Sequence, residues 1–473
     1  MSAAPLPRWR AFPVLAIGVV MATLDISVVN IALPTLSRTF DVPLTRIEWV
    51  VLAYVVTITG LLLTLGRVAD RAGRRRVYGL GLAVFAMASG LCGAAPSAAA
   101  LIAARVLQGA GAAMMSATGV ALLVASFPPE QRGRAIGAFG AMVGIGLAVG
   151  TPLGGLVIAH ASWRWLFFIN LPLALAAGLL LKRVPEDAPA PARTPLDLGA
   201  AATWCGALVA LMLALSRGPE LGWGNAQVWP LFAISLFLLL WFGTLERRSP
   251  EPLLPPRLVQ GPLGIAVLLT FLGQAFTIAV GFHLPLYLED VRGLSAEMSG
   301  RWLAVLPLTA LVTAPMAGGL ADRFGTRPVA TTGMALSVGG FGLLAQLGVA
   351  ADPWRLAGGM ALVGLGQGLF AVPNASALLS LVPRELLGFA SGLQGTMRNL
   401  GIASGSAGMA AMIASSYARI AGGALPIAGA ATLDRAAFAA ATRQAFGVLV
   451  VAAIVATLLA ASQKGTGARR ALN

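Results

Sequence analysis

Long runs of apolar residues, separated by short polar or Pro-rich segments, dominate the hydrophobic pattern of the chain. Each run has the length of about 20 residues that carries an α-helix across a bilayer. The pattern predicts about fourteen spanning helices, near residues 12–36, 48–69, 77–96, 98–126, 134–159, 165–182, 196–216, 228–245, 261–288, 299–320, 328–350, 355–382, 388–416 and 440–461. We therefore expect an all-α polytopic membrane protein.

The composition supports this fold class. Hydrophobic residues make up 58% of the 473 residues and charged residues 11%, against roughly 25% charged in soluble domains. An ordinary cytosolic enzyme is therefore excluded. The two cysteines, Cys92 and Cys205, lie in separate apolar runs, and no phosphate-binding GxxxxGK[ST] motif occurs, so we expect no disulfide framework, metal site or cofactor. Arg8 and Arg10 precede the first run without a small-residue cleavage site, which predicts a retained first span.

The net charge of +15 follows the predicted topology. If the N terminus is cytoplasmic, about 21 Lys and Arg residues fall in cytoplasmic loops and about 10 outside, as the positive-inside rule describes. The excess charge thus indicates orientation in an inner (cytoplasmic) membrane, with both termini cytoplasmic, and no nucleic-acid partner.

An internal repeat divides the chain. "GRVADRAGRRRV" (66–77) returns as "GGLADRFGTRPV" (318–329), an offset that weaker echoes share. The repeat predicts two six-helix halves, residues 1–182 and 261–473. Residues 183–260 then form a linker with two inserted helices, unless one of these segments is only interfacial.

Several motifs resemble one transporter family. They are "LDISVVNIALP" (24–34), "WVVLAYVV" (49–56), "RVLQGAGAA" (105–113), "WRWLFFINLP" (163–172), "LPLYLEDVRGLSAEMSG" (284–300) and "RNLGIASGSAG" (398–408). In this order and spacing, and with the repeated Asp-Arg loop, the chain resembles the major facilitator superfamily and, within it, the fourteen-span drug:proton antiporters. The resemblance implies the major facilitator fold.

Asp25 and Arg105 are ionisable residues inside predicted spans. A carboxylate at mid-membrane costs roughly 2.5–3.5 kcal/mol on the insertion scale and is rarely kept without a function. We expect Asp25 to carry the proton, with Arg105 sharing its cavity as the resemblance implies. Asp25 could instead be a hydrogen-bonded carboxyl in the helix packing, and Arg105 could bond backbone carbonyls.

The resemblance also implies residues that line the substrate cavity: Asn30, Tyr54, Gln108, Gln274 and Arg398. For Arg398, contact with the cavity or with neighbouring helices is equally compatible with the sequence. His160 and His283 are expected at outer membrane interfaces. Glu289 either adds a protonatable group at the outer mouth or is solvated.

Two further groups of residues are assigned by resemblance. The gating loops contain Gly66, Asp70, Arg71, Gly73, Arg74, Asp322 and Arg323. In them Asp70, Arg71 and Arg74 form a cytoplasmic latch that favours the outward-facing state, unless the loop is only a basic anchor. The antiporter helix contains Gly146, Gly150, Pro152 and Gly154. Glycines let helices approach closely and proline bends the axis, although Thr151 here separates Gly150 from the proline.

These features predict a monomeric proton-coupled exporter of amphipathic compounds. Monocationic or neutral substrates are favoured, because the spans hold one clear carboxylate and two arginines. A transporter of a native metabolite or lipid is the main alternative. A membrane enzyme would need clustered His, Cys, Asp or Glu, and a scaffold has no use for buried charge.

Overall fold

The computed structural model describes residues 9–42, 44–128, 131–186, 197–255, 261–350, 352–423 and 433–463. In this part of the chain the regular structure is entirely helical. All fourteen predicted apolar runs lie on helices, which confirms the all-α class. Among the described residues, eleven helical segments are long and apolar enough to cross a membrane. Helices α6, α15 and α17, which carry the other three runs, are not among them, so the count of fourteen spans stays a prediction.

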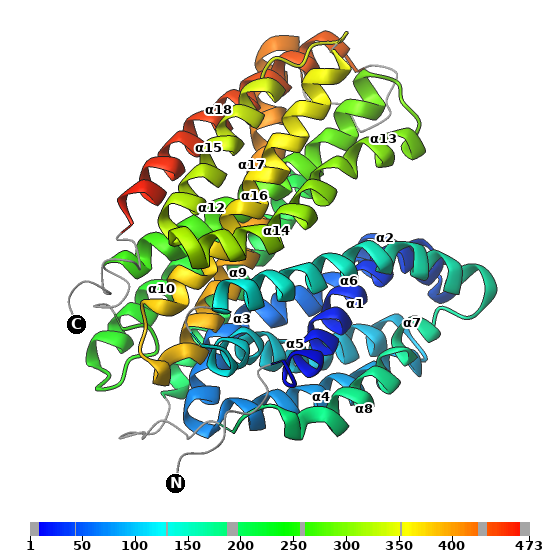
Figure 1. The fold of residues 1–473 in the computed structure, drawn as a ribbon. Helices are drawn as coiled ribbons and strands as arrows, with labels where there is room; N and C mark the ends of the chain where they lie inside the picture. The colour runs from blue at the N-terminus through cyan, green and yellow to red at the C-terminus, as the bar shows by residue number, and fades with distance from the viewer. Residues whose placement is uncertain are drawn as a thin grey trace. The chain divides into compact units, whose positions relative to one another are not determined.

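The chain forms two compact units, which are described separately. Unit 1 comprises Met1–Leu211, Ala233–Leu258 and Leu381–Thr396. Its helices are α1 (Phe12–Phe40), α2 (Leu44–Ile47), α3 (Trp49–Ala72), α4 (Arg74–Gly93), α5 (Ala98–Ser126), α6 (Arg132–His160), α7 (Trp165–Phe168), α8 (Asn170–Leu180) and the 3-10 turn η2 (Leu181–Arg183). Within it α5 packs on α3 and α4, α6 packs along α1, and α4 lies beside α8 (Figure 1).

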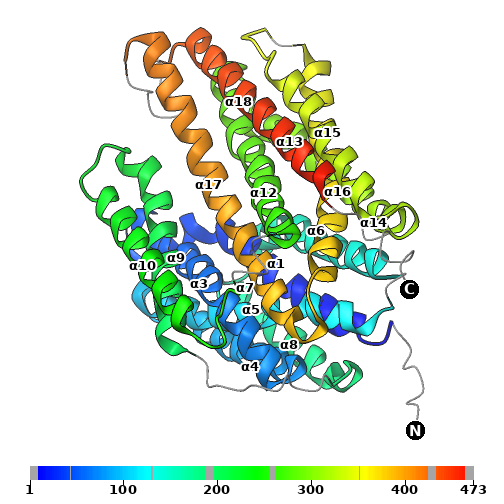
Figure 2. The same ribbon diagram turned by 90° about the vertical axis from the view of Figure 1, so that its left-hand side faces the viewer.

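Unit 2 comprises Met212–Phe232, Val259–Ser380 and Met397–Asn473. It contains α12 (Pro262–Leu286), the π-helical turn η3 (Tyr287–Val291), α13 (Ala296–Leu303), α14 (Val305–Phe324), α15 (Thr326–Leu344), α16 (Pro353–Ser380) and α18 (Arg435–Ser462). Helices α15 and α16 lie side by side (Figure 2). Both units contribute to α9 (Leu198–Leu221), α10 (Val228–Arg248) and α17 (Leu387–Ala421), and the turn η4 (Arg384–Leu386) precedes α17 in unit 1.

Glycine sets the turn in both copies of the repeated loop. Gly73 joins α3 to α4 with φ 95°, and Gly325 joins α14 to α15 with φ 90°. Residues with a side chain rarely adopt a positive φ, whereas glycine does so readily. A single glycine can therefore end one helix and begin the next. In each loop the glycine N–H still bonds the carbonyl four residues earlier, Ala69 or Ala321. The sequence repeat is therefore also a repeat of backbone geometry.

His283 lies in the core of unit 2 and is not a solvated side chain, while its expected position at an outer membrane interface stays a prediction. The side chain is 2% exposed, and one ring nitrogen lies 2.9 Å from the hydroxyl of Thr442. Its ring stacks on Phe438 with centroids 5.4 Å apart. The hydroxyl and the aromatic ring together replace the water that an interfacial histidine would contact. His160, at the end of α6, is exposed.

Candidate functional site

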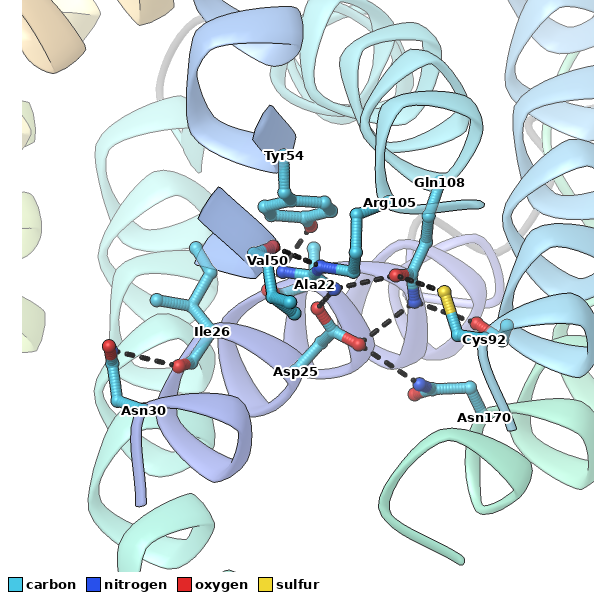
Figure 3. Close-up of polar contacts among 11 residues, drawn as sticks. Ala22, Asp25, Ile26, Asn30, Val50, Tyr54, Cys92, Arg105, Gln108 and Asn170 are labelled. Atoms are coloured by element: carbon cyan, nitrogen blue, oxygen red, sulfur yellow. Dashed lines mark hydrogen bonds and ion pairs between the residues drawn. The ribbon is translucent and has the colours of Figure 1, made fainter. Parts of the chain in front are cut away.

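Asp25 and Arg105 form an ion pair inside unit 1, between α1 and α5. Arg105 Nη1 donates to Asp25 Oδ2, and both side chains are 0% exposed (Figure 3). A charge so deeply buried is tolerated only when it is paired and hydrogen-bonded. The structure therefore brings together the two intramembrane charges that the sequence singled out in the first and fourth apolar runs.

The rest of the Arg105 guanidinium is held by α3. Its Nε donates to the carbonyl of Val50 at 2.8 Å, and its central carbon lies 4.1 Å from the ring centroid of Tyr54. The aromatic face stabilises the cation through its quadrupole. Tyr54, expected to line the cavity, is itself 0% exposed. In this conformation the ring of Tyr54 packs against the guanidinium of Arg105. That Tyr54 lines the substrate cavity stays a prediction.

Gln108 links the ion pair to α4. One turn after Arg105, its Nε2 donates to Asp25 Oδ1 at 2.9 Å and to Ser89 Oγ at 2.8 Å, while its Oε1 accepts from Arg105 Nη1 at 2.5 Å. The i, i+3 spacing places both side chains on one face of α5. Gln108 is also 0% exposed. Gln108 was expected to be a polar companion of Arg105, and these hydrogen bonds match that role. In this conformation its side chain is buried and is not exposed to a cavity.

Asn170, at the start of α8, also contacts the pair and was missing from the expected site. Its Nδ2 lies 3.4 Å from Asp25 Oδ1, and its side chain is 0% exposed. The sequence did contain a signal for Asn170, because it is the single amide within the motif "WRWLFFINLP". Only the packing of α8 against α1 shows that this amide reaches Asp25.

Two polar atoms of this cluster lack a hydrogen-bond partner among the described residues: Arg105 Nη2 and Asn170 Oδ1. Leaving a buried donor or acceptor unsatisfied costs about 1–3 kcal/mol. The cluster thus contains an unused donor and an unused acceptor next to a titratable carboxylate. Such an arrangement has capacity to form different bonds when the charge of Asp25 changes.

A glycine stripe on α6 holds the helix that carries Asp25. A Cβ added at Gly150 would lie 2.6 Å from Cβ of Ser27, and one added at Gly154 would lie 3.2 Å from Cα of Val28. Gly146 meets Thr23 even more closely. These glycines recur every four residues, so α6 presents one flat face to α1. Pro152 lies inside α6 and is exposed. The close packing expected of this motif is present.

The carboxylate of Asp70, near the end of α3, contacts the first turn of α17. Its Oδ1 accepts from the N–H of Gly388 and its Oδ2 from the N–H of Phe389, both at 2.8 Å. Arg74 donates to the same carboxylate at 2.8 Å and also to the carbonyl of Arg384. The first N–H groups of a helix have no partner within it, and the helix dipole favours a negative charge there. Asp70 therefore caps α17, and Arg74 joins the carboxylate to the preceding turn.

The segment after α10 docks on the same end of α3. Arg71 forms an ion pair with Glu251 at 2.9 Å, and Arg67 Nε donates to the carbonyl of Leu253 at 3.1 Å. Glu246 in turn accepts from the N–H of Leu253 at 3.0 Å. The sequence pattern did not predict the contacts of Arg67 or the acidic residues that meet this end of α3. The two segments are about 180 residues apart along the chain.

The remaining expected site residues lie elsewhere. Asn30 is exposed and lies apart from the Asp25 cluster, where its amide bonds the carbonyl of Ile26 (Figure 3). Arg323 is exposed, and its guanidinium lies over the ring of Phe324. Asp322 is half-buried and Glu289 is exposed. In unit 2, Gln274 is half-buried and Arg398 is exposed.

Comparison with known proteins identifies relatives over most of the chain. Residues 15–406 match the family model of the Major Facilitator Superfamily. The riboflavin transporter RibZ of Clostridioides difficile is 33% identical over 86% of this chain and 89% of its own. The puromycin resistance protein pur8 of Streptomyces alboniger is 34% identical over 85% and 80%. The multidrug resistance protein Stp of Mycobacterium tuberculosis is 34% identical over 84% and 74%.

Solved structures share the fold at low sequence identity. The proton:xylose symporter XylE aligns with a TM-score of 0.67, 16% identity and coverage of 97% of this chain and 96% of its own. The human organic anion transporter MFSD10 aligns with a TM-score of 0.66, 17% identity and coverage of 96% and 99%. At this identity the likeness concerns the fold alone.

Proposed function

The chain belongs to the major facilitator superfamily, a family of membrane transporters of small substrates, and from that premise we propose that it exports amphipathic compounds in exchange for protons. In this proposal the protein is a monomer in the cytoplasmic membrane with both termini cytoplasmic. Two six-helix halves and the two inserted helices together make fourteen spans.

The observation that carries the proposal is the buried Asp25–Arg105 pair. Protonation of Asp25 would neutralise one partner and leave Arg105 as an uncompensated buried cation, which is strongly unfavourable. Arg105 would then need a new partner or access to water, and Arg105 Nη2 and Asn170 Oδ1 are already unsatisfied. Proton binding at Asp25 would thereby change the packing of the helices around it. Proton-coupled transport requires such a link between proton binding and conformation.

Alternating access needs a contact that can form and break, and Asp70 supplies a candidate. Its two hydrogen bonds to the start of α17 and its pairing with Arg74 depend on α3 and α17 staying together. We assign Asp70, Arg71 and Arg74 to the cytoplasmic latch of the outward-facing state. Asp322 and Arg323 are assigned to the corresponding loop of the second half, with a weaker role.

The driving force is adequate for one proton per substrate. A membrane potential of 100 mV supplies about 2.3 kcal/mol per charge, which corresponds to a gradient of roughly fifty-fold. Exchange of one proton for one monocation is electroneutral and uses the pH gradient. Export of a neutral compound uses the pH gradient and the potential together. This stoichiometry favours monocationic or neutral substrates.

A second candidate is transport of a native metabolite. It is favoured by the 33% identity to a riboflavin transporter over 86% of this chain. Export of antibiotics or other drugs is favoured by the similar identity to puromycin and multidrug resistance proteins. One fold serves both substrate classes, so the two candidates differ in substrate and not in coupling.

The test is efflux of a fluorescent dye from cells that lack their own exporters. Expression of the chain should lower dye accumulation, and a protonophore should restore it. Dye export that survives the protonophore would reject proton coupling. Failure with all drug-like dyes, combined with transport of riboflavin in the same cells, would favour the metabolite transporter.

A further inference from the structure

Arg398 in unit 2 has no counterion among the described residues. It follows the first residue of α17 by eleven positions, about 17 Å along the helix axis. Among the described residues no acceptor hydrogen-bonds to its guanidinium. The sequences of α12, α15, α16, α17 and α18 contain no Asp or Glu, so these helices of unit 2 cannot supply a carboxylate.

The direction of Arg398 follows from the packing of α17 on α12. A Cβ added at Gly405 would lie 2.5 Å from the carbonyl oxygen of Ala275, and one added at Gly401 would meet the carbonyl oxygen of Phe271. Arg398 precedes these glycines by seven and three residues and so lies on the same side of α17. Despite this position on a helix-packing face, its side chain is exposed.

One amide lies near this face of α17, and a second lies on α16 against the adjoining residue of α12. Gln274 of α12 is half-buried, and its Cβ is 3.1 Å from the position that a Cβ on Gly401 would take. The neighbouring Gly273 touches Gln367 of α16, whose Oε1 would be 3.3 Å from an added Cβ. Gln367 is 6% exposed, and its Nε2 has no acceptor among the described residues. Unit 2 thus contains an unpaired guanidinium and a buried amide donor whose acceptor is missing.

We propose that Arg398, assisted by Gln274, binds an acidic group on the substrate, most simply a carboxylate. This inference rests on the proposed exporter function and narrows its neutral substrates to zwitterionic amphipathic compounds. A planar guanidinium forms two parallel hydrogen bonds to a carboxylate, and an amide donor can add a third. An arginine within a predicted span typically faces the bundle interior or a water-filled cavity and marks a substrate path, so the anion of the substrate would be the counterion of Arg398.

The unit 1 pair explains why this substrate class fits the chain. The charge of Asp25 is already matched by Arg105, so Asp25 offers no free negative charge to a cationic substrate in this conformation. Arg398 is then the charge left for recognition. A zwitterion is neutral overall and stays within the range that one-proton exchange can drive.

The experiment uses two dyes that differ in one group. Rhodamine B has a free carboxylate, and in its ethyl ester that carboxylate is blocked. Binding of both to the purified full chain in lipid nanodiscs is measured by fluorescence polarisation. We expect the acid to bind about tenfold or more tightly than the ester, as a charge-assisted hydrogen bond implies.

Substitutions assign this preference to Arg398. Arg398→Gln should weaken binding of the acid about tenfold or more and change binding of the ester less than about threefold, with Arg398→Lys between them. Arg435→Gln, at the exposed first residue of α18, is the matched control for loss of one charge and should change the binding of neither dye.

Equal weakening of the binding of both dyes in Arg398→Gln would overturn the proposal, and so would the absence of an acid preference in the wild type. If Arg398→Gln does not fold, the wild-type preference and Arg398→Lys decide.

Efflux from proteoliposomes with an imposed pH gradient separates this inference from the exporter function. Export of the ester without any preference for the acid keeps the exporter and rejects the acid site. Acid-selective binding without gradient-driven export of either dye supports the acid site and rejects proton coupling.

Discussion

Gly66 of α3 and Gly388 of α17 lie in direct backbone contact. A Cβ added at Gly66 would collide with the carbonyl oxygen of Gly388, and one added at Gly388 would lie 2.5 Å from the carbonyl oxygen of Gly66. Each position requires glycine because the neighbouring atom belongs to a backbone and cannot rotate away. This contact brings Asp70, one turn beyond Gly66, to the N–H groups that begin α17.

Gly66→Ala should separate α3 from α17 and weaken the Asp70 cap. Overpacking of this kind costs typically about 1–3 kcal/mol, so we expect a lower melting temperature in detergent and severalfold slower efflux. Gly243→Ala on α10 is the control, because nothing lies within 4 Å of its added Cβ. Equal behaviour of the two variants would contradict a tight contact at Gly66.

Asp25→Asn should abolish proton-driven efflux, by about a hundredfold or more, while expression and membrane insertion remain. The amide cannot titrate, so proton binding no longer changes the partner of Arg105. Asp25→Glu keeps the titratable group and should retain part of the activity. Asp41→Asn, at the exposed end of α1, serves as the control, since Asn also accepts its left-handed backbone. Full energised transport by Asp25→Asn would remove Asp25 from coupling.

Arg105→Gln should destabilise the protein more than the double substitution Asp25→Asn with Arg105→Gln. The single change leaves a buried carboxylate unpaired, at a cost of about 3–5 kcal/mol, whereas removal of both charges is much less harmful. Thermal unfolding of the single and double variants measures this coupling. The double variant should remain inactive in transport, which distinguishes the role of the pair in coupling from its role in stability. Additive effects on stability would mean that the two charges do not interact.

Asp70→Ala should weaken the association of α3 with the start of α17 and shift the population toward inward-open states. Hydrogen bonds to a charged group contribute about 1.5–3 kcal/mol each, so the equilibrium should move by at least about tenfold. Arg75→Ala and Arg327→Ala should matter less, because the ion-pair partner of Arg75, at 3.9 Å, is the exposed Glu186, and Arg327 is itself exposed. The measurement is the spin-label distance between the ends of α3 and α17. Unchanged distances in Asp70→Ala would reject the latch.

Dications should be exported poorly. The clear carboxylate within the spans is already paired with Arg105, and exchange of one proton for a dication moves net positive charge out against an inside-negative potential. Burial of the second charge without a partner is also expensive. Efflux of a lipophilic monocation is compared with that of its bis-quaternary analogue of matched hydrophobicity. Equal export of the two would indicate a further acid on the substrate path, with Glu289 the first to be tested.

The sequence alone predicted the helical membrane fold and its family. Apolar runs of span length persist along the whole chain, and helices in a bilayer must satisfy their backbone groups internally, so length and hydrophobicity suffice to locate them. The paired Asp-Arg loops and Asp25 and Arg105 were equally visible, because a charge is conspicuous among apolar residues. The cost of its burial is a local property of the residue type.

The tertiary structure decided which atoms meet. Asn170, Ser89 and the Val50 carbonyl come to the ion pair from three other helices, and Asp70 meets α17 more than 300 residues later. Burial of Tyr54, Gln108 and His283, and exposure of Arg398, likewise depend on which face each helix turns to its neighbours. Hydrophobic periodicity is weak in helices that are apolar all round, so facing is set by glycine contacts and ridge packing between distant segments. The sequence thus determined where the charges are, and the packing determined which of them are paired.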